Sequence, residues 1–152
     1  MRQPLVLKST VLFVLLAACE AGAQGLGFQG GVAVDPSQVY AGSHVESGAL
    51  VDHLHLRPSI DGGFGSGLRV AIIDVTFLYK IPLGTSRWTL FQGTGPTIGI
   101  ARINDQTNVH GGLGAVFGVS HTNGFLTEFK VSGAGGPNLR FGIGYTVRRR
   151  RP

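Results

Sequence analysis

The most informative segment for the fold lies close to the C-terminus and reads Leu139-Arg140-Phe141-Gly142-Ile143-Gly144-Tyr145-Thr146-Val147. Its large apolar residues alternate with residues that are small or polar. Successive side chains of a β-strand point to opposite faces, so this alternation predicts a strand with one apolar face and one small or polar face.

Seven earlier segments alternate in a similar way and are separated by turn signals such as Asp35-Pro36-Ser37-Gln38, Gly65-Ser66-Gly67 and Asn123-Gly124. Asn123-Gly124 is typical of a type I′ hairpin turn. We expect residues 47–52 and 102–108 to be loops, and we expect a bulge or irregularity at Pro58, which lacks a backbone donor. The eight predicted strands are 26–34, 39–46, 53–64, 69–81, 88–101, 109–120, 125–132 and 139–147.

Eight antiparallel strands joined by short turns predict a closed up-and-down β-barrel, either a transmembrane barrel or a soluble ligand-binding barrel. In a soluble barrel the large apolar residues fill the interior, whereas in a membrane barrel they face outwards. The polar faces here combine many glycines with a few charges, which suits a narrow interior better than a solvent-exposed surface. The pattern therefore favours an all-β, eight-stranded antiparallel transmembrane barrel. The direction in which four phenylalanines point distinguishes the two barrels, because they face outwards in a membrane barrel and inwards in a soluble one. These residues are Phe77, Phe117, Phe129 and Phe141.

The N-terminus has the pattern of a secretory signal peptide over residues 1–23, with Arg2 and Lys8 before an apolar run from Val11 to Ala18. Two processing sites compete. Ala21-Gly22-Ala23 would leave a mature chain that begins at Gln24, and the stretch 16–19 resembles a lipoprotein box that would leave a lipidated Cys19. Cys19 is the one cysteine in the chain, so an intrachain disulfide is excluded.

The net charge of +5 comes from 13 Lys and Arg residues against 8 Asp and Glu residues. Removal of residues 1–23 takes away Arg2, Lys8 and Glu20 and leaves 11 basic against 7 acidic residues, or +4, which the four arginines 148–151 account for. The body of the barrel, residues 24–147, is therefore neutral, and its charge does not indicate nucleic-acid binding. The basic tail, residues 148–152, would contact anionic head groups or peptidoglycan, or form a plain extension.

The last strand resembles the closing strand of small bacterial outer-membrane β-barrel proteins, the eight-stranded class of the OmpA transmembrane domain and OmpX. Their C-terminal assembly signal has its polar, glycine, aromatic and final apolar positions filled here by Arg140, Gly142, Tyr145 and Val147. The family usually ends on Phe, whereas Val147 is followed by the arginine tail. The resemblance implies export to the bacterial outer membrane, outer-membrane lipid and the barrel-assembly machinery as partners, a monomeric state and a porin-like or OmpA-like cell-envelope protein.

The predicted inward faces carry charged residues that are costly to bury unless they are paired. We expect acids and bases to alternate across neighbouring strands, with a pair between Glu128 and Arg140 on sequential strands. Such a network would form either a structural plug or a gate across a narrow lumen. Its predicted members are Arg57, Asp61, Asp74, Glu128, Lys130 and Arg140.

The histidines offer little support for a chemical site. His53 and His55 share a strand face and His44 lies on the next strand, yet nothing completes a metal-ligand set, so we expect no metal and no cofactor. Ser43-His44 and Ser120-His121 supply the residue types of a lipid-modifying enzyme, but adjacent strand residues point to opposite faces. Trp88, Tyr79, Tyr145 and Phe125 lie near segment ends, as in an interfacial aromatic girdle or in ordinary core packing.

The sequence therefore predicts a non-enzymatic outer-membrane barrel with a structural, surface-interaction or narrow-pore role. A soluble or lipid-anchored periplasmic barrel that binds a small apolar ligand is the main alternative, and a lipid-modifying enzyme is the second.

Overall fold

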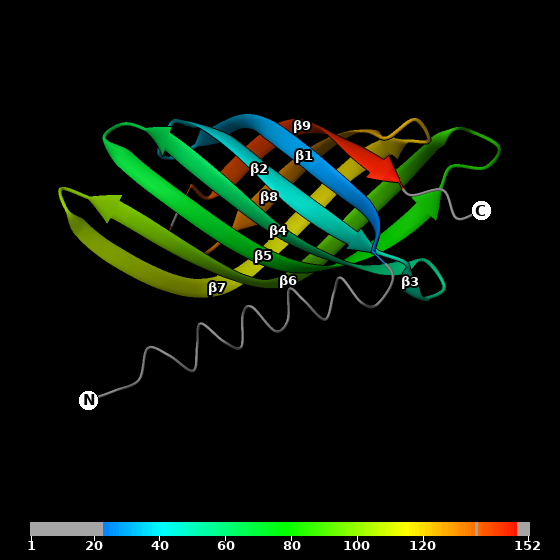
Figure 1. Cartoon of the computed structure of the whole chain (residues 1–152), viewed down its shortest axis with the longest axis horizontal. Helices are drawn as coiled ribbons and strands as arrows, with labels where there is room; N and C mark the ends of the chain where they lie inside the picture. The colour runs from blue at the N-terminus through cyan, green and yellow to red at the C-terminus, as the bar shows by residue number, and fades with distance from the viewer. Residues whose placement is uncertain (1–22, 136, 149–152) are drawn as a thin grey trace.

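The computed structural model describes residues 23–135 and 137–148, which form nine β-strands (Figure 1). The predicted signal peptide through Gly22, Cys19 and residues 149–152 of the basic tail lie outside the described residues. The strands are β1 (Ala23–Val34), β2 (Gln38–Ser47), β3 (Ala49–Val51), β4 (Leu54–Gly65), β5 (Leu68–Pro82), β6 (Trp88–Ile103), β7 (Gln106–His121), β8 (Phe125–Ser132) and β9 (Leu139–Arg148).

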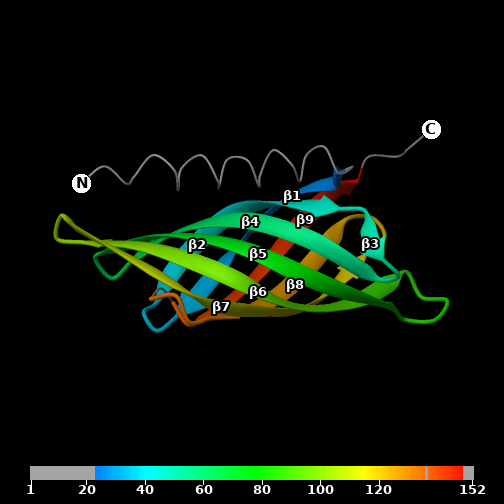
Figure 2. The same cartoon turned by 90° about the horizontal axis from the view of Figure 1, so that it is seen from below.

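Eight of these strands close into an antiparallel barrel. Each strand pairs with its neighbours in the order β2-β1-β9-β8-β7-β6-β5-β4, and a pairing between β2 and β4 completes the circle. The strands surround one common barrel axis in two perpendicular views (Figures 1 and 2). The final strand closes the barrel against the first, with Tyr145 opposite Phe28 and Val147 opposite Leu26. The predicted eight-stranded up-and-down barrel is thus confirmed.

The turns differ from the prediction in three places. The expected loop 47–52 contains the short strand β3, which pairs with β4. The expected loop 102–108 is mostly strand, since β6 and β7 run to a two-residue turn at Asn104 and Asp105, both with positive φ (47° and 65°). The positive-φ pair of a type I′ turn is found there, whereas Gly124 (φ 106°) is the positive-φ residue of the Asn123-Gly124 hairpin.

Pro58 interrupts the wall on one side. Its register with β5 is regular, with Pro58 opposite Val75, so the expected bulge is absent from that ladder. The ladder between β2 and β4 ends next to it, at His44 opposite Ser59. Beyond this gap the Ser47 hydroxyl accepts a hydrogen bond from the backbone N–H of Leu56 at 2.8 Å, which replaces part of the lost pairing. Proline has no N–H to donate, so the irregularity falls on the β2 side.

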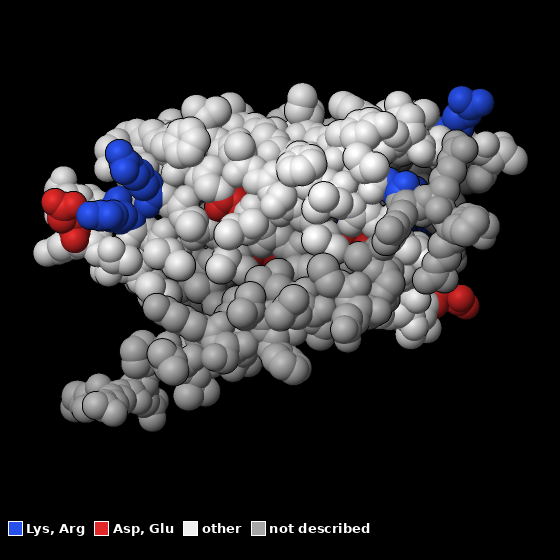
Figure 3. Space-filling view, in the orientation of Figure 1, with Lys and Arg blue, Asp and Glu red and all other residues white. Residues whose placement is uncertain are grey.

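Large apolar side chains cover the outside of the barrel. Phe77, Phe117, Phe129 and Phe141 are 49%, 50%, 39% and 55% exposed, whereas the charged residues of the alternate positions are buried. This arrangement is that of a transmembrane barrel, and it is the reverse of a soluble ligand-binding barrel. In the space-filling view, charged atoms gather mainly at the two ends of the molecule and the side wall is largely uncharged (Figure 3). Among residues 23–135 and 137–148, no helix is long and apolar enough to span a membrane.

Candidate functional site

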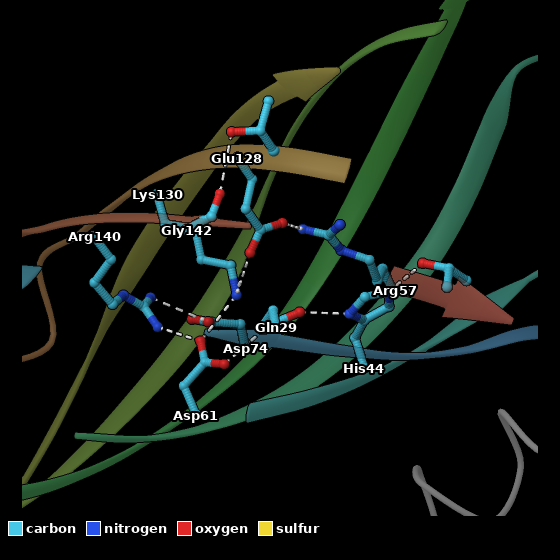
Figure 4. A network of polar contacts seen from close by, with 11 residues as sticks. Gln29, His44, Arg57, Asp61, Asp74, Glu128, Lys130, Arg140 and Gly142 are labelled. Atoms are coloured by element: carbon cyan, nitrogen blue, oxygen red, sulfur yellow. Dashed lines mark hydrogen bonds and ion pairs between the residues drawn. The ribbon is translucent and has the colours of Figure 1, made fainter. Parts of the chain in front are cut away.

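The predicted inward-facing charges meet in one polar network in the middle of the barrel (Figure 4). All six side chains are buried, with relative exposures between 1% and 6%. Asp61 lies at the centre, where its Oδ2 accepts hydrogen bonds from the Lys130 Nζ at 2.9 Å and the Arg140 Nη1 at 2.6 Å. The other Arg140 nitrogen, Nη2, donates to Asp74 Oδ2 at 3.2 Å. The Arg57 Nη2 donates to Glu128 Oε2 at 2.7 Å, and Lys130 links the two halves by its 3.2 Å ion pair with Glu128 Oε1.

The network is electrically balanced. Three cations, on Arg57, Lys130 and Arg140, face three carboxylates, on Asp61, Asp74 and Glu128. Lys80 and Glu46 form a further pair nearer the end of the barrel that carries the termini. Desolvated charges are tolerated when each has an opposite charge and good hydrogen bonds, so this balance is what makes a polar interior compatible with a membrane fold.

The partners differ from the predicted ones. Glu128 lies opposite Gly142, and Arg140 lies opposite Lys130, so the expected pair between Glu128 and Arg140 does not form. The ion pairs also do not alternate across neighbouring strands. Arg57 is on β4 and Glu128 on β8, while Asp74 is on β5 and Arg140 on β9, so these bridges cross the lumen between strands that are not neighbours in the sheet.

A chain of neutral polar groups extends the network. The Gln29 amide donates to Asp61 Oδ1 at 2.6 Å, and its carbonyl oxygen contacts His44 Nδ1. The other ring nitrogen of His44 lies 2.9 Å from the Thr146 hydroxyl. Gln29 and Thr146 were not among the predicted members of the network, although both occupy inward positions of the alternating pattern. His44 is 1% exposed, and both of its ring nitrogens make polar contacts inside the barrel.

Two clusters of buried apolar side chains lie inside the barrel, one towards each end of the network. Leu78, Phe91, Val116 and Leu126 form one buried cluster, towards the end that carries the termini. Val70, Ile72 and Ala101 form a second cluster, with Leu68, towards the opposite end. The Arg57 guanidinium lies 5.2 Å from the centre of the Phe91 ring, which joins the first cluster to the ions by a cation–π contact. These inward apolar positions were not part of the predicted interior.

Glycines provide the room for these large inward groups. A Cβ on Gly118 would lie 2.4 Å from the Phe91 ring, and a Cβ on Gly42 would lie 2.0 Å from Asp61 Oδ1. At both positions the neighbouring strand also leaves no space, with backbone carbonyl oxygens at 2.3 and 2.4 Å. The abundance of glycine on the inward faces is therefore a packing requirement of a narrow, filled barrel.

The other candidate sites remain separate from one another. His53 stacks edge-on against Tyr79 at 5.9 Å, and His55 contacts the carbonyl oxygen of Ser47. In the described part of the chain no group of three metal-ligating side chains converges. Ser120 is buried, whereas His121 packs against Trp88 on the outside, so this pair does not form a dyad.

Four aromatic residues lie on the outside of the barrel at the end that carries the termini. Tyr79 is near the end of β5, Trp88 begins β6, Phe125 begins β8 and Tyr145 is near the end of β9. All are more than a third exposed, and Trp88 and Phe125 pack edge to face at 6.5 Å. Their outward orientation agrees with an interfacial girdle and not with core packing.

The same barrel architecture occurs in solved structures of other proteins. No protein-family model and no curated protein matches the chain. Among solved structures, neisserial surface protein A superimposes with a TM-score of 0.64 at 12% identity, over 82% of this chain and 95% of that one. The N-terminal β-barrel domain of OprF from Pseudomonas aeruginosa gives a TM-score of 0.59 at 12% identity, over 83% of this chain and 99% of that one. The chain has the fold of the small eight-stranded outer-membrane β-barrels.

Proposed function

We propose that this chain is a non-enzymatic protein of the bacterial outer membrane, with a structural or surface-contact role and a lumen closed to ions. The observation that carries the proposal is the filled interior. A charge-balanced network whose bridges cross the lumen lies between two apolar clusters. The apolar outer wall supports contact with lipid, and the fold shared with outer-membrane barrels supports export to that membrane.

Fractionation of cells and gel mobility test the location. The protein expressed in a Gram-negative host is expected in the outer-membrane fraction, resistant to extraction by salt. An unboiled sample in SDS is expected to migrate differently from a boiled one, because a closed barrel has no free strand edge at which the detergent could begin to separate the strands. Recovery in the salt-soluble fraction, with identical mobility in both samples, would contradict the proposal.

Planar bilayer recordings test the closed lumen. Purified, heat-modifiable protein is expected to give no conductance steps above those of the detergent control. Regular steps from the wild-type barrel would instead assign a narrow-pore role. A variant that carries Phe91→Ala and Leu78→Ala removes the large side chains of one apolar cluster, and it tests whether that cluster limits ion passage.

A further inference from the structure

Two arginines lie side by side on the outer surface of the barrel, at the end opposite the termini. Arg69 is the second residue of β5, and Arg102 is the residue before the last of β6. They are direct cross-strand partners in the register of these two strands. Both side chains are exposed, since the inward positions next to them are occupied by Val70 and Ala101. Basic atoms gather at this end in the space-filling view (Figure 3).

The protein balances the charge of this arginine pair only in part. Like charges directly opposite each other on neighbouring strands repel. Asp105 pairs with Arg102 at 2.8 Å, but its side chain is 92% exposed, so the pair contributes little. Among the residues that the structure describes, no carboxylate lies within ion-pair distance of Arg69. The two exposed guanidinium groups therefore have N–H donors that are available to an anion from outside the chain.

The two arginines line an open pocket of about 300 Å³. Gly67 of the turn between β4 and β5 lines it on one side, and Asn104 and Asp105 of the turn between β6 and β7 line it on the other. Two guanidinium groups offer planar sets of N–H donors that match the oxygens of a phosphate, and the Asn104 amide adds a further donor. The Asp105 carboxylate would repel a phosphate, so binding requires that Arg102 exchange this partner for the ligand.

The position of the pocket along the barrel axis matches the level of lipid head groups. Along β6 the outward side chains Ile98 and Ile100 precede Arg102, and along β5 the outward residues after Arg69 are Ala71 and Ile73. The arginines therefore lie just beyond the apolar belt, which is about 25 Å tall in barrels of this kind. Phosphate groups of membrane lipids lie at that level.

We propose that Arg69 and Arg102 form a binding site for a phosphate group, as carried by the head group of a membrane lipid. The site rests on the proposed position of the barrel in a membrane, but not on a structural role or on a closed lumen. The two guanidinium groups bind the phosphate from neighbouring strands, and its ester group faces the lipid along the barrel wall.

Lipid titration of the purified full chain, folded in a neutral detergent and followed by native mass spectrometry, tests the site. The probe is dioleoyl phosphatidic acid, and dioleoylglycerol, with the same acyl chains and no phosphate, is the reference lipid. The variant R69Q/R102Q is expected to bind phosphatidic acid at least tenfold more weakly than the wild type, because charge-assisted hydrogen bonds are lost. Binding of dioleoylglycerol is expected to stay the same.

R87Q is the matched control, since Arg87 is an exposed arginine in the turn between β5 and β6 at the other end of the barrel. Equal affinity of R69Q/R102Q and wild type for phosphatidic acid would overturn the proposal, as would an equal loss in R87Q. Heat-modifiable mobility verifies that each variant is folded, and R69Q alone carries the test if the double variant does not fold. Competition by inorganic phosphate identifies the source: displacement of the lipid shows a site for phosphate itself, and retention shows a site for the intact lipid.

Discussion

Asp61 is the residue on which the interior depends most. It is 1% exposed and accepts hydrogen bonds from Gln29, Lys130 and Arg140. The variant Asp61→Asn leaves the two cations short of one negative charge inside the barrel. Removal of one partner from a buried ion pair costs about 3–5 kcal/mol, so we expect the free energy of unfolding to fall by that amount. Urea unfolding in lipid vesicles, followed by the fluorescence of Trp88, the one tryptophan, measures it.

Asp35→Asn is the control for this change. Asp35 is exposed in the turn between β1 and β2, with a φ of 60° that asparagine tolerates well. A shift within about 0.5 kcal/mol is expected there. If Asp61→Asn and Asp35→Asn had the same free energy of unfolding, the Asp61 carboxylate would contribute no more to stability than an exposed surface charge.

Substitution of Gly118 tests whether the inward glycines are needed because a larger side chain would not fit. A methyl group there meets the Phe91 ring and the Thr127 carbonyl oxygen, at 2.4 and 2.3 Å. Gly118→Ala is therefore expected to destabilise the barrel by about 1–3 kcal/mol, the usual cost of overpacking. Gly111→Ala, on the same strand with open space around the added Cβ, is expected to be neutral or slightly stabilising. Equal effects in the same urea assay would show that strand propensity, and not space, explains the glycines.

At the scale of the strand, β9 combines closure of the barrel with the predicted assembly signal. Tyr145 is 50% exposed and pairs with Phe28 on one side and Phe125 on the other, so it lies on the outer face where another protein can reach it. Tyr145→Ala is expected to slow assembly in cells several-fold and to change the stability of the folded barrel little. Pulse-chase labelling, with heat-modifiable mobility as the sign of folding, measures the rate. Phe64→Ala, an exposed aromatic at the other end of the barrel, is expected to assemble normally; equal delays would contradict a role for the signal.

The strands could be predicted because each has two chemically different faces. The alternation located all eight barrel strands, and its apolar face lies outwards as expected. The tight turn at Asn104 was missed because polar residues at 104–108 resemble a loop, although the chain continues as paired strand. The ion pairs could not be predicted from neighbouring strands. Which charges meet across a lumen depends on the register of every strand in between. Arg57, for example, pairs with Glu128, which is 71 residues away in the sequence.

For the whole molecule, an even number of barrel strands places both ends of the barrel domain on one side of the membrane. β1 begins and β9 ends at the same end, and the hairpin between β6 and β7 lies at the other (Figure 1). We expect the termini to lie in the periplasm, and on that orientation this hairpin would face the outside of the cell. The orientation also sets which leaflet supplies the lipid phosphate for Arg69 and Arg102, since both lie at the hairpin end.

Single cysteines at the two ends test this orientation. Gln106→Cys places a thiol at the tip of the hairpin between β6 and β7, and Thr85→Cys places one in the exposed turn between β5 and β6. A thiol reagent that does not cross membranes is expected to label Gln106→Cys in intact cells, and to label Thr85→Cys after the outer membrane is opened. The unsubstituted chain, whose one cysteine is Cys19, gives the background. The opposite labelling would place the hairpin in the periplasm and the phosphate site of Arg69 and Arg102 at the inner leaflet.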